Sequence, residues 1–287
     1  MTVAITGASG PLGRSTADHL LRLAGPTEVV LATRRPDALA DLAARGAGVR
    51  RVDFTEPGTF ATAFAGVDRL LIISTDAIGA RLDQHRAAIE GAAAAGVRHI
   101  VYTSVPEPVP ANPALVVADH AGTEQALYDS GLTWTVLRNN LYAHMQIPVI
   151  EQAITSGRLV TNGGDGATAY VTREDCAAVA AAVLTQDGHE DRVYDVTGPE
   201  ALTAADLAAL AGEVGGRPVE PVALDDDAMA AGLRAAGAPE EAAELVVSFG
   251  AATRLGFLAH VSSTVADLTG RPATPLADLL RTVLPAR

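Results

Sequence analysis

Cysteine is almost absent from this sequence, and side chains spaced for metal binding are missing. The single cysteine, Cys176, excludes an internal disulfide and a thiolate zinc cluster, and its Ala-rich helical surroundings predict ordinary packing. The seven histidines never occur as HxH or HxxxH, and no Asp/Glu cluster repeats at ligand spacing. We therefore expect no metal site.

Long apolar runs are also missing. No stretch approaches the apolar length of a membrane span, about 18 residues, and the first expected strand lies where a signal peptide would be. These absences predict no membrane association and a cytoplasmic location.

Positive charge is scarce as well. The chain has 21 Lys and Arg against 34 Asp and Glu, a formal net charge of -13. Because nucleic-acid binding depends on a basic surface, we expect no nucleic-acid partner. Hydrophobic residues make up 48% of the 287 positions, which is enough for one large core, or one core with a smaller satellite domain.

Short β-branched runs alternate with longer Ala- and Leu-rich stretches of helical spacing, a pattern typical of a parallel sheet covered by helices on both faces. The expected strands are Thr2–Thr6, Glu28–Thr33, Val49–Asp53, Arg69–Ile73, His99–Thr103 and Thr133–Leu137. The expected helices between them are Leu12–Leu23, Asp37–Arg45, Glu56–Phe64, Ala80–Ala95 and Asp119–Ser130.

After Arg138 the alternation is looser. Helices are expected near Tyr142–Thr155, Arg173–Thr185, Thr203–Ala211, Asp226–Ala236 and Pro239–Val247, with a short strand near Val193–Thr197. We therefore predict an α/β fold with a doubly wound parallel (Rossmann) sheet. Residues 1–140 would form an NAD(P)-binding domain, and residues 141–287 a smaller C-terminal α/β substrate portion with some returns to the main sheet.

Three glycines at steps of three, Gly7, Gly10 and Gly13, follow the first expected strand directly and open the first expected helix. In a strand–turn–helix unit the first glycine permits the tight turn, the second lets the backbone approach a pyrophosphate, and the third allows close helix packing. The N–H groups of the helix N-terminus then face the phosphates. This spacing predicts a dinucleotide site; the alternative is a glycine turn without a ligand.

The end of the second expected strand indicates which dinucleotide. An acidic residue there would bind the ribose 2′-hydroxyl of NAD, whereas arginine pairs with the 2′-phosphate of NADP. The chain has Arg34 and Arg35 and no carboxylate, so NADP is favoured, although NAD stays compatible and solvated surface arginines are the alternative. At later strand ends, Asp53, Phe54 and Thr55 could flank the adenine, and Ser74 and Thr75 could lie beside the phosphate–ribose path.

Several segments together resemble an atypical short-chain dehydrogenase/reductase of the NmrA-like group: "TGASGPLG", "ATRRP", "VDFTEP", "LLIIST", "RHIVYTS", "LRNNLYAHM" and "AYVTREDCAAVAAAVL". Within that group the resemblance is closest to NADPH:quinone oxidoreductases and triphenylmethane reductases. It implies an NADPH-binding Rossmann domain, a small C-terminal domain, and a cleft between them for a planar aromatic acceptor. The cofactor-binding residues expected from motif and resemblance are Gly7, Ser9, Gly10, Pro11, Leu12, Gly13, Arg34, Phe54, Thr55, Ser74, Thr75, Thr103 and Ser104.

The family's usual acid is missing. A short-chain dehydrogenase carries a tyrosine and, four residues later, a lysine; here Val116 and His120 occupy those places. His120 could contact the nicotinamide ribose or could be a packing histidine. Asn139 could meet the nicotinamide and Tyr142 could form a wall of the substrate cleft; helix capping and packing are their alternatives.

These observations predict hydride transfer from NAD(P)H to a quinone or a related polycyclic aromatic acceptor. A variant is a secondary-metabolite tailoring enzyme, including oxygen-dependent chemistry on a polyketide quinone. The alternative from another class is a non-catalytic NADP(H)-sensing regulatory protein. A homodimer is compatible with each of these functions.

Overall fold

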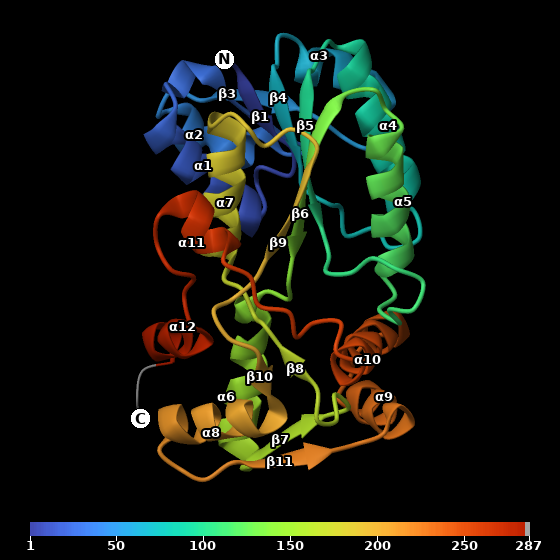
Figure 1. Ribbon diagram of the computed structural model, residues 1–287, viewed down its shortest axis with the longest axis vertical. Helices are drawn as coiled ribbons and strands as arrows, with labels where there is room; N and C mark the ends of the chain where they lie inside the picture. The colour runs from blue at the N-terminus through green and yellow to red at the C-terminus, as the bar shows by residue number, and fades with distance from the viewer. Residues whose placement is uncertain (285–287) are drawn as a thin grey trace.

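Seven parallel strands form the centre of the protein in the spatial order β3-β2-β1-β4-β5-β6-β9. Figure 1 shows the computed structural model, which describes residues 1–284. The strands are β1 (Val3–Ile5), β2 (Val29–Thr33), β3 (Gly48–Arg51), β4 (Arg69–Ile72), β5 (His99–Ser104), β6 (Thr133–Asn139) and β9 (Arg192–Val196). The strand order reverses between β1 and β4, which is the switch point where doubly wound sheets bind ligands. The predicted Rossmann fold class is confirmed.

Helices cover both faces of this sheet (Figure 1). One face carries α1 (Pro11–Leu23), α7 (Arg173–Thr185) and the short α11 (Thr264–Thr269); the other carries α3 (Phe60–Phe64), α4 (Arg81–Ala94) and α5 (Val117–Tyr128). Helix α2 (Ala40–Ala43) is short, as are the 3-10 turns η1 (Pro26–Glu28), η2 (Pro36–Leu39), η3 (Pro57–Thr59) and η4 (Ala143–Met145).

Side chains alternate between the two faces along each central strand. Val3 and Ile5 pack in the layer of α1 and α7, whereas Ala4 between them packs in the layer of α3 and α4. Both faces of these strands are therefore buried under helices, which explains why their sequences are nearly continuous apolar runs. Cys176 lies buried in the first layer, where burial raises the pKa of its thiol, so its predicted packing role is confirmed.

The remaining elements form a second, smaller layer below the carboxyl ends of the strands (Figure 1). They are α6 (Gln146–Ser156), β7 (Arg158–Thr161), β8 (Ala167–Thr168), β10 (Leu202–Thr203), α8 (Ala204–Gly215), β11 (Glu220–Ala223), α9 (Asp226–Ala235), α10 (Glu240–Arg254) and α12 (Leu276–Val283). Strand β7 pairs with β11 in parallel, and β8 pairs with β10 in antiparallel. Of the helices formed by residues 1–284, none combines the length and the apolar character that crossing a bilayer requires.

The structure refines several expected elements. The expected helices at 37–45 and 56–64 each begin as a 3-10 turn and contain only a short α-helix. Strands β7, β8, β10 and β11 and helices α11 and α12 were not expected. Helix α7 and strand β9 come from beyond residue 140 and belong to the layers of the main sheet, while the domain division at residue 140 stays a prediction.

Helix α1 approaches the end of β1 more closely than a side chain allows. A Cβ added to Gly13 would lie 2.4 Å from the Gly7 carbonyl oxygen and 2.7 Å from the Ala8 Cα, and both neighbours are backbone atoms. Gly7 itself has φ +62, which favours glycine. The first and third motif glycines are therefore required by the fold itself.

We expect Gly13→Ala to lower the free energy of unfolding by about 1–3 kcal/mol, because the backbone around residue 7 must move to admit the methyl group. The control is Gly232→Ala in α9, where an added Cβ meets no atom within 4 Å. The free energy of unfolding of this control should rise by about 0.4–1 kcal/mol, because alanine leaves the unfolded chain fewer conformations than glycine does. Urea denaturation of both variants tests the pair; equal effects would contradict the close contact.

Candidate functional site

A cavity of 390 Å³ lies at the carboxyl ends of β1, β2 and β4, and it is the candidate dinucleotide site. Of the residues expected to bind the cofactor, nine line this cavity: Gly7, Ser9, Gly10, Pro11, Arg34, Phe54, Thr55, Ser74 and Thr75. It is also lined by Thr33, Asp53, Ile73 and Gln84, among others. The strand-end segments named from the sequence thus meet in one place.

The glycine turn is tied to the end of β2. The Ser9 hydroxyl lies 2.8 Å from the Thr33 hydroxyl, and the Thr33 hydroxyl also accepts the Arg35 N–H at 3.2 Å. Gly10 is the N-cap of α1 and no side chain caps this helix, so its first N–H groups stay open to a phosphate. These contacts hold the turn and the segment of Arg34 at a constant separation.

Arg34 supplies positive charge to the cavity. Its side chain is exposed, and no ion pair with a residue among 1–284 occupies it. Asp53 opposite is engaged in its own turn, accepting the Thr55 N–H at 3.0 Å and the Thr55 hydroxyl at 2.8 Å. These two bonds hold the pKa of Asp53 below its usual range. A guanidinium at this wall suits the 2′-phosphate of NADP.

Helix α4 clamps Thr75 from behind the cavity. The Thr75 carbonyl accepts Nε of Arg81 at 2.6 Å, and its N–H donates to Nε2 of His85 at 3.1 Å. Its hydroxyl donates to the side-chain amide oxygen Oε1 of Gln84 at 3.0 Å. All three polar groups of Thr75 are therefore held by the first two turns of one helix, which fixes the end of β4.

His120 belongs to this clamp and does not line the cavity. Its Nε2 lies 3.1 Å from Nη1 of Arg81, and its Nδ1 lies 2.7 Å from the Tyr102 hydroxyl. Because a guanidinium only donates, Nε2 must accept, so the ring is neutral with its proton on Nδ1. Burial, with the charge of Arg81 added, holds the pKa of His120 well below its usual range. His120 therefore positions Arg81.

Four other expected contacts also lie off the cavity wall. Leu12 is buried in the core, and Gly13 lies under the turn. The Thr103 hydroxyl accepts the Ser74 N–H at 2.9 Å, so Thr103 supports a lining residue. Ser104 points to the opposite face, where its hydroxyl donates to Glu124 at 2.6 Å. As contacts of the cofactor, these four residues stay predictions.

The end of β6 contains a buried hydrogen-bond acceptor without a partner. Oδ1 of Asn139 is buried without a hydrogen-bond partner, and its Nδ2 approaches the Tyr142 hydroxyl at 3.5 Å. Asn139 ends β6 and caps no helix. Arg173 lies over the Tyr142 ring, 5.5 Å from its centroid, and burial raises the pKa of the Tyr142 phenol, which is therefore neutral. A free buried acceptor suits an amide N–H₂ such as that of the nicotinamide carboxamide.

Sequence reasoning missed the α4 clamp. Arg81, Gln84 and His85 carry no local signal, since they act on a residue that only the packing of α4 brings near. Asp53 was predicted together with its strand-end motif and lines the cavity, whereas Thr33 was visible only as the residue before Arg34. Among residues 1–284, no group of three or more His, Cys, Asp or Glu is arranged to hold a metal ion.

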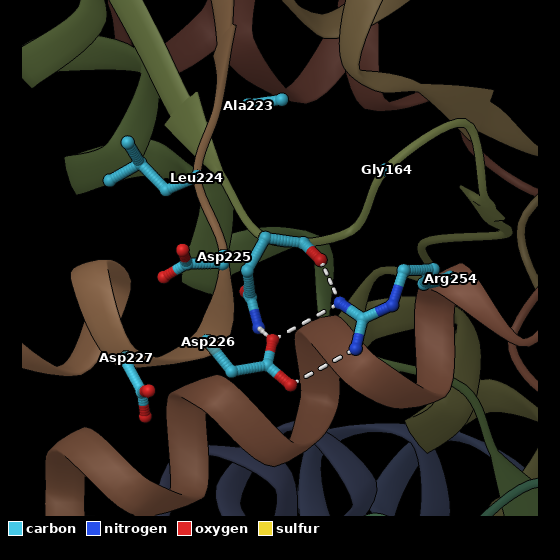
Figure 2. Close-up of a pocket in the computed structure, with 8 residues that line it drawn as sticks. Gly164, Ala223, Leu224, Asp225, Asp226, Asp227 and Arg254 are labelled. Carbon is cyan, nitrogen blue, oxygen red and sulfur yellow. Dashed lines mark hydrogen bonds and ion pairs between the residues drawn. The ribbon is translucent and has the colours of Figure 1, made fainter.

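A wider depression of 680 Å³ lies elsewhere, in the C-terminal portion, and is built around a closed ion pair (Figure 2). There the Asp226 carboxylate accepts hydrogen bonds from Nη1 and Nη2 of Arg254 at 3.1 and 3.0 Å, and from Nδ2 of Asn162 at 2.8 Å. None of the residues expected at the cofactor site or the acceptor site lines this depression, so despite its size it is not the candidate reaction site.

Residues 7–187 match a family model described as NAD(P)H-binding. Quinone oxidoreductase 2 of Escherichia coli is 36% identical over 276 residues, which covers 96% of each chain. The chain belongs to this NAD(P)H-binding family. The predicted NmrA-like membership and NADP cofactor are confirmed, and the chain is an NAD(P)H-dependent oxidoreductase.

Two solved structures agree with this assignment. The NADPH-dependent quinone oxidoreductase of Escherichia coli in complex with NADPH has a TM-score of 0.95 at 35% identity, covering 98% of this chain and 99% of that chain. The triphenylmethane reductase of Citrobacter sp. in complex with NADP(H) has a TM-score of 0.91 at 31% identity, covering 99% of this chain and 100% of that chain.

We expect Arg34→Ala to weaken NADP binding by roughly one to two decades, because a hydrogen bond to a charged group contributes about 1.5–3 kcal/mol. NAD affinity should stay within about threefold, since NAD lacks the 2′-phosphate. Titration calorimetry with both nucleotides measures the two effects, and Arg192→Ala, an exposed arginine at the amino end of β9 and outside the cavity lining, is the matched control. A wild-type protein that binds NAD as tightly as NADP would refute this role.

Proposed function

We propose that this oxidoreductase transfers hydride to a quinone, or to a related electron-poor aromatic acceptor whose reduced form is weakly basic. The observation that carries the proposal is the lack of an acid at the family's usual place. Val116 is 6% exposed and packs in an apolar cluster with Phe249 and Phe257. Both ring nitrogens of His120 are committed, and the sequence contains no lysine.

The missing acid restricts the acceptor. Hydride addition to a simple ketone leaves an alkoxide, about as basic as hydroxide from water with its pKa of ~15.7, and requires a positioned proton donor. A quinone instead leaves a phenolate-type anion with a pKa near that of tyrosine, ~10, which water can protonate afterwards. A quinone therefore needs positioning more than acid catalysis.

The chain's own residues supply this positioning. Bound NADPH provides the hydride. The open N-terminus of α1 and Arg34 would hold its phosphates, the clamped Thr75 would lie beside its ribose, and Oδ1 of Asn139 would accept from the carboxamide. The neutral Tyr142, with its ring oriented by Arg173, would form a wall of the acceptor site.

The names of the two relatives agree with such acceptors, because one is a quinone oxidoreductase and the other a triphenylmethane reductase. Quinones and triphenylmethane dyes are both conjugated molecules that accept hydride without a strong acid. A role in secondary metabolism, a reaction with oxygen, a homodimer and a cytoplasmic location stay predictions.

We expect NADPH oxidation with quinones and triarylmethane dyes and none detectable with simple aliphatic ketones.

His120→Gln keeps an acceptor for Arg81 and a donor for Tyr102, so its kcat on a quinone should stay within about tenfold of wild type, below the 10²–10⁴-fold typical of a lost general acid. The loss of NADPH absorbance measures both effects.

If His120→Gln instead loses three decades in kcat and keeps its nucleotide affinity, His120 is a proton donor. Simple carbonyl compounds would then again be candidate substrates. Tight NADPH binding with no turnover on any acceptor would favour the sensing alternative.

A further inference from the structure

An apolar groove of 200 Å³ lies in the C-terminal portion, between α6, β7, α8, α9 and α10, and is separate from the dinucleotide cavity. Besides Met1, the chain has two methionines, and both of them, Met145 and Met229, line this groove. Methionine side chains are flexible and polarisable, and they are frequent on surfaces that adapt to apolar ligands.

Exposed apolar side chains gather in the same groove. Met145, Val149, Val160 and Val246 are 39–45% exposed, and all four belong to its lining. Singly exposed apolar residues need no explanation, whereas several around one concavity mark a binding site.

Three polar side chains of the lining, those of Thr161, Asn162 and Thr253, are engaged in hydrogen bonds within the protein. The Thr161 hydroxyl accepts the Gly163 N–H at 3.0 Å, and the Thr253 hydroxyl donates to the Phe249 carbonyl at 3.0 Å. Nδ2 of Asn162 donates to the Val247 carbonyl at 2.9 Å and to Asp226. Apart from the Gln146 amide and the Tyr170 hydroxyl, the groove therefore offers a ligand mainly dispersion contacts and water exclusion.

One wall of the groove is the loop after β7, and its backbone packs closely against a neighbouring helix. A Cβ on Gly166 would lie 2.0 Å from the Thr253 carbonyl oxygen, so the loop backbone packs directly on α10. Asn162 and Gly164 line both this groove and the depression of Figure 2, where Arg254 donates to the Asn162 carbonyl. The ion pair in Figure 2 thus supports the wall from its other side.

The groove begins beside the proposed reaction site. Leu141, between Asn139 and Tyr142 in the chain, lines it. Phe249 also lines it and packs in the cluster that contains Val116, at the place of the missing tyrosine. A substituent on an acceptor held near these residues would have this apolar surface next to it.

We propose that this groove binds an apolar alkyl or prenyl-like substituent of the acceptor, and that the preferred substrates are alkylated quinones. This inference rests on the proposed quinone reduction. Since a cavity of about 150 Å³ accommodates benzene, the groove has room for about eight carbon atoms.

The test compares a tail-less benzoquinone with derivatives that carry pentyl, heptyl and decyl chains. In the wild type, KM should fall by about two- to fourfold for each added carbon and level off near eight carbons. Val246→Trp, and independently Val149→Trp from the opposite wall, should reduce the dependence on chain length to within about threefold overall. Val193→Trp places the same change on β9, outside the groove, on a valine of similar exposure, and should keep the full dependence.

The outcomes separate the two proposals. If the tail-less quinone is reduced but chain length has no effect, or its effect survives in both groove variants, the groove assignment is overturned and quinone reduction stands. If no quinone is reduced, the proposed function fails, and calorimetric titration of the heptyl quinone into the NADP-bound protein tests the groove alone. Binding that Val246→Trp abolishes would support the groove, and absent binding would overturn it.

Discussion

The contact between the first turn of α1 and the end of β1 is the constraint on which the dinucleotide cavity depends. Because residue 13 has no side chain, the helix can rest against the carbonyl of Gly7. This places the uncapped N-terminus of α1 at the switch point of the sheet, where anionic groups are favoured by open N–H groups and by the helix dipole. The bond between Ser9 and Thr33 then sets the position of Arg34 relative to that N-terminus.

The polar groups behind the cavity satisfy one another, and this has a chemical consequence. Arg81 is buried with no carboxylate partner among residues 1–284, and it is held by the Thr75 carbonyl and by a neutral His120. A histidine that accepts a hydrogen bond from a guanidinium cannot easily gain a proton. His120 therefore positions Arg81, which in turn holds Thr75 at the end of β4. The proposed acceptor site is then left with Asn139, Tyr142 and apolar surface.

The two parts of the molecule contribute different kinds of recognition. The main sheet offers backbone N–H groups, hydroxyls and a cation, which suit a charged dinucleotide. The C-terminal portion offers methionines, valines and a glycine-rich loop packed on α10, which suit an apolar ligand. Glycine has the same physical role in both parts: it lets one backbone approach another closely enough to shape a cavity.

The fold class, the NADP cofactor and the glycine turn after the first strand could be predicted from the sequence, because each depends on local patterns such as apolar strand runs, glycine spacing and a strand-end arginine. Other features depend on long-range packing: Ser104 faces Glu124 while Thr103 supports Ser74, and His120 meets Arg81, 39 residues earlier in the chain. The two-residue strands β8 and β10 are too short to show a period, and the groove combines segments between residues 141 and 253. Such features arise from packing between distant segments, and a single sequence carries no local signal of which segments will meet.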